Sequence, residues 1–131
     1  MSATVKVDLG AGELIDKITI LQIKSERITD EGKLVNIRHE LDVLTRTRDE
    51  QMQGTDELTK LSTELKQINE KIWEIEDDIR ACESRKDFGE TFIELARGVY
   101  HTNDKRAAVK KQINLLTGSD IIEEKSYTDY S

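Results

Sequence analysis

Residues 58–82, LTKLSTELKQINEKIWEIEDDIRAC, carry the most regular pattern in the sequence. Apolar side chains recur there in strictly alternating steps of three and four residues. This spacing keeps one apolar stripe along a helix and matches the heptad repeat of helices that pack lengthwise. It predicts a helix over 56–86 with this stripe facing a partner: Leu58, Leu61, Leu65, Ile68, Ile72, Ile75, Ile79, Cys82.

A second apolar stripe follows after Gly89 and predicts the partner helix over 89–117. If the chain turns at 87–89, one antiparallel register pairs the two stripes along their whole length. Two polar residues, Thr102 and Arg106, fall on this seam. Arg106 either extends its guanidinium to solvent or pairs with Glu64 or Glu70. The second stripe consists of Phe92, Leu95, Val99, Val109, Ile113 and Leu116.

Two shorter helices precede this long hairpin, over 13–30 and 33–51. With a turn around 31–32, their stripes also pair in one antiparallel register. The fold class is therefore all-α, with two antiparallel hairpins, one short and one long, forming an elongated bundle. We expect a single domain over 1–131, with 1–12 as an N-terminal extension and 118–131 as a C-terminal tail. The short stripes are Leu14, Ile18, Leu21, Ile28 and Leu34, Ile37, Leu41, Leu44.

The two hairpins differ in length. At 1.5 Å per residue the short helices span about 27 Å and the long ones about 45 Å. The distal half of the long hairpin should overhang and leave apolar surface for a second copy. We predict a homodimer with an interface at Trp73, Ile75, Ile79, Phe88, Phe92 and Tyr100.

This topology brings the start of the first helix and the end of the last helix to one pole. The C-terminal tail can then fold back over the GAGEL segment, or it can remain a disordered terminus. Short alternating segments at 5–7 and 120–122 are also compatible with a small two-stranded ribbon from the two termini. The pole is therefore where a ligand site would form.

Composition limits the partners. With 27 acidic and 20 basic residues the net charge is −7, which disfavours nucleic acids and anionic membrane surfaces as partners. The single cysteine, Cys82, excludes an internal disulfide and fits a reducing compartment. Because MSATVKVDLG lacks an apolar signal core, we expect a cytoplasmic protein.

The candidate binding residues lie on one flank of the first helix and in the tail. The flank can form ion pairs on a central helix, or its cations can bind an anion such as a phosphosugar, nucleotide or dicarboxylate. Glycines before a helix start suit either an ordinary loop or an anion held by backbone N–H groups. The candidates are Gly12, Glu13, Asp16, Lys17, Lys24, Arg27, Glu123, Glu124, Lys125 and Tyr127.

Catalytic and metal-binding patterns do not emerge from the sequence. His39 and His101 are far apart, and Cys82 lies on an apolar stripe where a buried, inert thiol is expected. We predict no metal and no cofactor. Our first hypothesis is a non-enzymatic, self-associating helical module that can also bind another protein. The alternative is a small-anion binding protein or enzyme with its site at the pole.

Three segments carry a resemblance to a known family. GELIDKITILQIKSERI near the start, KLVNIRHEL and the terminal IIEEKSY resemble a family found in bacteria, including marine ones, and in phages, classified as a domain of unknown function. The resemblance spans nearly the whole chain. Some members lie near cell-surface polysaccharide genes, but the family implies no mechanism.

The first helix is also similar to that of helical-class chorismate mutases. The similarity rests on Ile15–Asp16, Ile18, Leu21 and Arg27. It implies an enzyme that holds a dicarboxylate in a cationic pocket, without a cofactor. The chain departs from that pattern, because no arginine precedes the Ile-Asp pair and Gly32 interrupts what should be one long helix.

Overall fold

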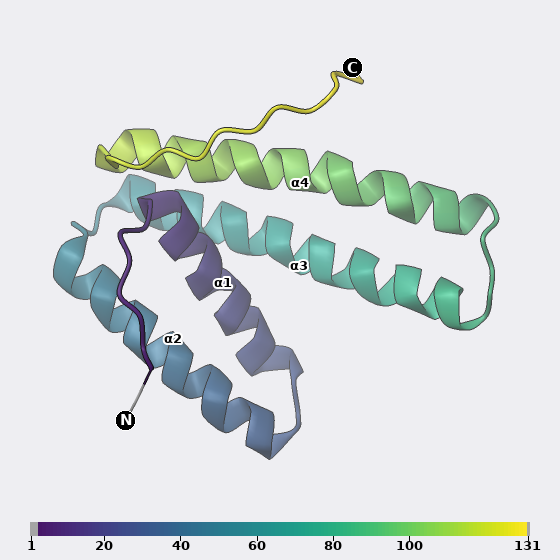
Figure 1. Ribbon diagram of the computed structural model, residues 1–131, viewed down its shortest axis with the longest axis horizontal. Coiled ribbons are helices and arrows are strands. Elements are labelled where there is room, and N and C mark those ends of the chain that lie inside the picture. The colour runs from purple at the N-terminus through teal and green to yellow at the C-terminus, as the bar shows by residue number, and fades with distance from the viewer. Residues whose placement is uncertain (1–2, 131) are drawn as a thin grey trace.

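The computed structural model describes residues 3–130, and these form two helical hairpins (Figure 1). The short hairpin consists of α1 (Ala11–Arg27) and α2 (Glu31–Gln51), and the long one of α3 (Asp56–Ser84) and α4 (Glu90–Thr117). The short hairpin lies obliquely across the proximal half of the long one, and the distal half extends beyond it. The predicted all-α bundle of two hairpins is confirmed.

Local capping groups explain where the helices begin and end. The Asp30 carboxylate accepts a hydrogen bond from the Lys33 amide at 3.1 Å and starts α2, so the first turn lies at 28–30 and Gly32 lies inside the helix. Thr55 caps α3 in the same way through the Leu58 amide. α4 ends at Thr117 and is followed by Gly118, which adopts a left-handed conformation that glycine accepts without strain.

α1 is the central helix, because it contacts each of the other three. One core cluster joins Ile15 and Ile18 of α1 to Leu65 of α3 and Ile113 of α4. A second cluster joins Leu21 of α1 to apolar side chains of α2. Apolar residues on several sides of α1 are thus explained by burial against several partners.

The predicted common pole is present: α1 and α3 start there, and α2 and α4 end there (Figure 1). The predicted ribbon was wrong, since residues 3–10 and 119–130 contain no strand. From the pole the tail turns back along α4, whereas the N-terminal segment runs away over the short hairpin. The two segments approach at Gly10 and Ile121 and then diverge, so they cannot pair.

The distal half of the long hairpin leaves apolar side chains in solvent. Phe88 and Ile93 are 52% and 53% exposed, although Phe88 also packs edge-on against the ring of Phe92 at 5.3 Å. Two other members of the predicted interface are more covered: Ile75 is buried against α4 near Gly98, and Ile79 is partly buried. No helix in the described part of the chain has both the length and the apolar character that a membrane span requires.

Candidate functional site

Gly12, in the first turn of α1, allows that helix to press against α4. A Cβ atom on Gly12 would lie 2.3 Å from the carbonyl oxygen of Lys110, so only glycine fits this crossing. The Gly12 amide donates to Asn114 Oδ1 at 2.7 Å, and the Ala11 amide donates to Ser119 Oγ at 3.2 Å. Side chains from the end of α4 and from the tail therefore cap α1. They occupy backbone N–H groups that the sequence suggested for anion binding.

This crossing brings Asp16 of α1 against α4 and α3 in a buried polar network. Asp16 is 1% exposed and receives two hydrogen bonds from the Arg106 guanidinium, one from Nε at 2.9 Å. Asn69 of α3 donates to the same carboxylate at 2.9 Å and to Thr19 Oγ1 at 3.0 Å. We call Asp16, Thr19, Asn69 and Arg106 the inner network.

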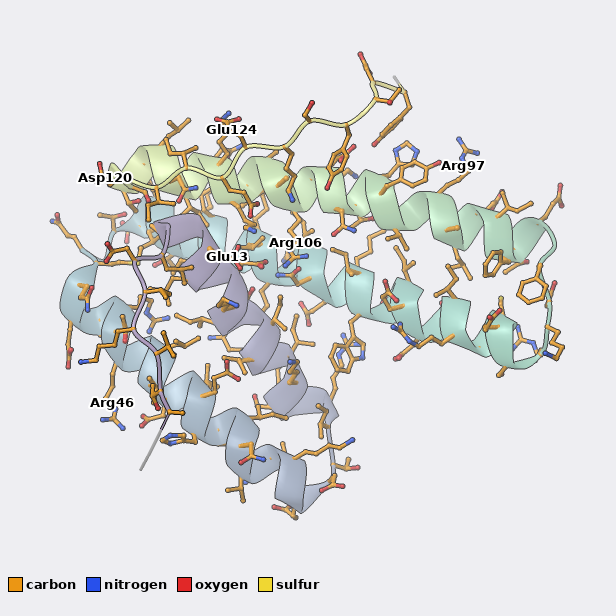
Figure 2. The ribbon with its side chains drawn as sticks, in the orientation of Figure 1. Glu13, Arg46, Arg97, Arg106, Asp120 and Glu124 are labelled. Atoms are coloured by element: carbon orange, nitrogen blue, oxygen red, sulfur yellow. The ribbon has the colours of Figure 1, made fainter. Side chains whose placement is uncertain are left out.

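Within the inner network, Arg106 joins α4 to α1. The expected partners Glu64 and Glu70 were wrong, because the oblique crossing places a buried carboxylate of α1 nearer to the guanidinium. The hydrogen bond with Asp16, and then the nearby negative charges, raise the pKa of Arg106 despite the opposing effect of burial. Figure 2 shows Arg106 beside Glu13 where α1 meets the long hairpin.

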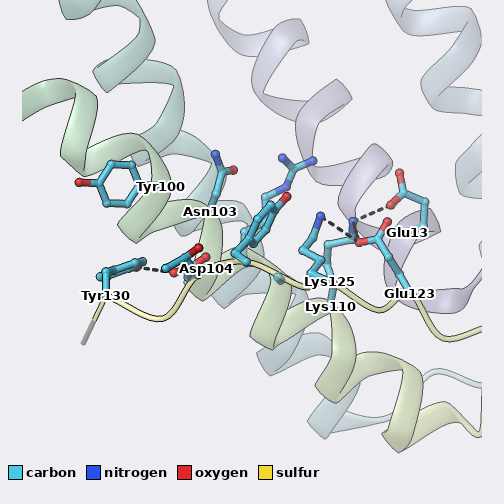
Figure 3. Close-up of a pocket in the computed structure, with 12 residues that line it drawn as sticks. Glu13, Tyr100, Asn103, Asp104, Lys110, Glu123, Lys125 and Tyr130 are labelled. Carbon is cyan, nitrogen blue, oxygen red and sulfur yellow. Dashed lines mark hydrogen bonds and ion pairs between the residues drawn. The ribbon is translucent and has the colours of Figure 1, made fainter.

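One helical turn beyond Arg106, Lys110 lies at the centre of an outer set of charges. Its ammonium group contacts Glu13 Oε2 at 2.6 Å and Glu123 Oε1 at 3.3 Å, and its side chain is only 9% exposed. Lys125 approaches the same Glu123 oxygen at 3.6 Å (Figure 3). Helix α1, helix α4 and the tail thus meet at one buried ammonium group.

The pKa values of this outer set follow from its charges. Burial alone would lower the pKa of Lys110, but its hydrogen bond with Glu13 and the charges of Asp16, Glu13 and Glu123 outweigh it and raise the pKa. For Glu123, burial would raise the pKa, but Lys110 and then Lys125 outweigh it and lower the pKa. Both groups are therefore held in their charged forms.

Residues 119–130, which we call the strap, cross the outer face of α4 without regular secondary structure. In its middle, Glu124 pairs with Lys111 at 3.2 Å. Near its end, the Tyr130 hydroxyl donates to Asp104, and its ring packs on His101 at 4.7 Å. Together with the contacts of Ser119 and Glu123, these fasten the strap to the helices at its start, middle and end, and the segment between Glu124 and Tyr130 arches over α4.

A pocket of about 790 Å³ lies beneath this arch. It contains cations and carboxylates in equal number, together with tyrosine rings and one amide. Such a lining can bind an anionic group, hydroxyl groups and an apolar ring face in one ligand. Its lining, which defines the strap pocket, is Glu13, Tyr100, Asn103, Asp104, Arg106, Ala107, Lys110, Glu123, Lys125, Tyr127, Thr128 and Tyr130.

The predicted site residues divide into two groups. The structure brings Glu13, Glu123, Lys125 and Tyr127 together in the strap pocket. The others lie behind it or away from it. Among these, Arg27 pairs with Glu70 and Glu74 of α3 at 3.8 and 3.5 Å.

The residues outside the pocket have identifiable positions. Lys17 is exposed and lies 3.8 Å from Glu13, and Glu124 faces Lys111 on the outer side of α4. Asp16 and Gly12 lie at the crossing beneath the pocket, and Lys24 lies two turns farther along α1 than Lys17. The charged flank of α1 is therefore not one continuous site.

Sequence reasoning missed Lys110, Asn103, Asp104 and Tyr130, and it assigned Tyr100 to the dimer interface. Within the chain, Tyr100 packs on Tyr130 with ring centroids 5.3 Å apart. One signal was available, since a polar residue on the apolar seam of α4 marks the side that α1 approaches. Lys110 follows that residue, Arg106, at the i+4 position on the same face.

Fold and site together define a small all-helical protein with a polar pocket lined partly by its own C-terminal segment. The chain belongs to the family described as a family of unknown function, DUF6165, whose model matches residues 5–130. This confirms the resemblance inferred from its motifs. No curated protein and no solved structure matches the chain. Within residues 3–130, no three His, Cys, Asp or Glu side chains are grouped to hold a metal ion.

Proposed function

We propose that the protein binds a small ligand in the strap pocket, and that the ligand carries one anionic group on a hydroxylated ring. The observation that supports this most strongly is Lys110, a nearly buried ammonium group that lines the pocket. Burying a cation is costly unless anionic partners surround it. One of its two partners, Glu123, comes from the strap and is 48% exposed, so that position can be taken by another oxyanion.

The charge balance of the lining favours this class of ligand. Three cations, Arg106, Lys110 and Lys125, face three carboxylates, so the pocket as a whole is close to neutral. Those carboxylates repel a polyphosphate more strongly than a ligand with a single anionic group, because the repulsion grows with the ligand's charge. The carboxylates can accept hydrogen bonds from ligand hydroxyls.

The aromatic residues favour a ring. Tyr100, Tyr127 and Tyr130 contribute flat apolar faces with hydroxyl groups at the edge of the same pocket. A sugar ring has apolar faces and a polar rim, which matches tyrosine rings interleaved with carboxylates. We therefore place phosphosugars and sugar acids ahead of nucleotides and simple dicarboxylates.

A thermal-shift screen with glucose 6-phosphate, glucuronate, nucleotides and dicarboxylates tests this function. We expect the sugar anions to raise the melting temperature, and Lys125→Ala to abolish that rise. Lys105→Ala removes an exposed α4 cation outside the pocket and is the matched control, so it should respond like the native chain. The proposal fails if no anion stabilises the protein or if Lys125→Ala responds unchanged.

A second candidate function, self-association through the distal tip, is supported by the exposed Phe88 and Ile93. A two-fold contact between two such tips would cover both side chains. We expect a homodimer in sedimentation or light-scattering measurements, and a monomer for Ile93→Glu. Val35→Glu places the same charge at an exposed apolar position of α2 and should remain dimeric. A native chain that is monomeric at tens of micromolar would contradict this candidate.

A further inference from the structure

The strap places one of its own carboxylates inside the strap pocket. Glu123 Oε1 lies 3.3 Å from the Lys110 ammonium and 3.6 Å from that of Lys125, so one oxygen lies between two cations (Figure 3). These are the two pocket cations whose charge is not committed to the inner network. The position that a ligand anion would take is therefore already filled by the chain.

We propose that Glu123 is an internal pseudo-ligand: its carboxylate occupies the anion subsite formed by Lys110 and Lys125, and the ligand binds by displacing it. This inference rests on the proposed function and adds the location of the subsite, the size of the group it takes and the means by which access is controlled. The strap is then both the cover of the pocket and its competitor.

The contacts of Lys110 show which carboxylate can leave. Glu13 holds the ammonium at 2.6 Å from the side of α1, and its side chain is 28% exposed. Glu123 holds it at 3.3 Å from an irregular segment, and its side chain is 48% exposed. Because a half-exposed ion pair contributes little net stability, exchange of Glu123 for a ligand oxyanion costs little. Glu13 remains in place and keeps Lys110 charged.

The neighbouring strap residue provides an internal comparison. Glu124 also fastens the strap to α4, but through Lys111, which does not line the strap pocket. Loss of either carboxylate removes one negative charge and one fastening point from the strap. Only the loss of Glu123, and not that of Glu124, empties the subsite.

The group that Glu123 imitates defines the ligand chemistry. A subsite filled by one carboxylate oxygen between two ammonium groups accepts a planar carboxylate or one edge of a phosphate monoester. Glucuronate and glucose 6-phosphate carry these two groups on comparable sugar rings, and glucose carries neither. Comparing the three sugars therefore separates the contribution of the anionic group to binding from that of the sugar ring.

Isothermal titration calorimetry with these three sugars tests the inference on the full chain. We expect Glu123→Gln to bind at least one of the charged sugars roughly fivefold tighter than the native chain, because the competitor is gone. Glu124→Gln is the matched control and should bind within about twofold of the native chain, since it vacates no subsite. Glucose should not gain affinity in either variant.

The outcomes separate this inference from the proposed function. If the native chain binds a charged sugar and Glu123→Gln binds it no more tightly, the pseudo-ligand is overturned while the binding function stands. If neither chain binds either charged sugar, both fail. An equal gain in both variants would indicate a general charge effect and overturn the inference.

A measurement without ligand tests occupancy of the subsite. In an NMR titration of the native chain, the Glu123 carboxyl should titrate below 4.5, and Lys125→Met should move it upward. Titration at 4.5 in the native chain would mean that the carboxylate does not occupy the subsite. That result would overturn the inference whatever the sugars do.

Discussion

The inner network and the strap pocket meet at Arg106 of α4, and Lys110 of the pocket lies one helical turn beyond it, yet the polar groups of the two regions are held in different ways. Asp16 is 1% exposed and bonded by Arg106 and Asn69, so each member is fixed by a neighbouring helix. Lys110 instead shares its charge between helix α1 and a half-exposed glutamate of an irregular strap. The first arrangement stabilises the crossing of the helices. The second leaves a charged position open to exchange.

The largest expected effect is on the inner network. Replacing Asp16 with alanine leaves Arg106 and Asn69 without their shared acceptor, which should lower the free energy of unfolding by about 3 kcal/mol. Asp42→Ala removes the fully exposed pair with Arg46 and should not change stability measurably. Urea denaturation measures both variants. Equal stability of the two variants would show that the inner network does not hold the helices together.

The close crossing of α1 over α4, which positions both the inner network and the strap pocket, depends on Gly12. Gly12→Ala would place a methyl group 2.3 Å from the Lys110 carbonyl oxygen, so α1 must move away from α4. We expect a loss of about 2 kcal/mol in the free energy of unfolding, together with altered NMR shifts at Lys110. Gly54→Ala has no neighbour within 4 Å and is the matched control. A Gly12→Ala variant as stable as the control would contradict the close crossing.

Acid should weaken the contact between the strap and Lys110, because that contact depends on the Glu123 carboxylate. The pKa of Glu123 is lowered in the folded chain, so its stabilising contribution is fully present above 4.5 and is lost as the pH falls through the folded value. Strap amide signals at Ser126 and Tyr127 should therefore change with a midpoint below 4.5. In Glu123→Gln this acid transition should be absent. A midpoint above 4.5 would contradict the ion pairs described for Glu123.

The smallest expected effect is at the far end of the strap. The hydrogen bond to Asp104 raises the pKa of Tyr130 to about 12 from an ordinary 10.0. Its contribution is present below the ordinary value and is lost as the pH rises through the folded value. Tyrosinate absorbance should show a late step near pH 12 that Tyr130→Phe removes. A late step that survives in Tyr130→Phe would contradict this fastening point.

The sequence predicted the hairpins because their apolar spacing is a local property. Leu65 and Ile113, on the two predicted stripes, share one core cluster in the structure. The inner network was less accessible. Arg106 stood out on the seam of α4, but its partner Asp16 is 90 residues away, and its identity depends on how the two hairpins cross.

The strap pocket was predicted only in part for a related reason. Topology placed the tail and Glu13 at one pole, so four of the lining residues were among the candidates. Lys110 was missed because its burial follows from the Gly12 crossing; its i+4 spacing from Arg106 places it on the same face of α4 but does not show how closely α1 packs there. The predicted ribbon was wrong because a short alternation of apolar and polar residues does not require a strand. Here the tail makes its contacts with helix α4 and stays irregular.

The most direct test of the account is an NMR titration of the full chain with glucose 6-phosphate. We predict that shift changes concentrate at Lys110, Lys125 and Tyr127, while Asp16 and Asn69 of the inner network stay unchanged. The strap signals should move with the same binding curve as Lys110. If no chemical shifts change, or if the changes centre on the inner network or on α2, a ligand site beneath the strap is contradicted.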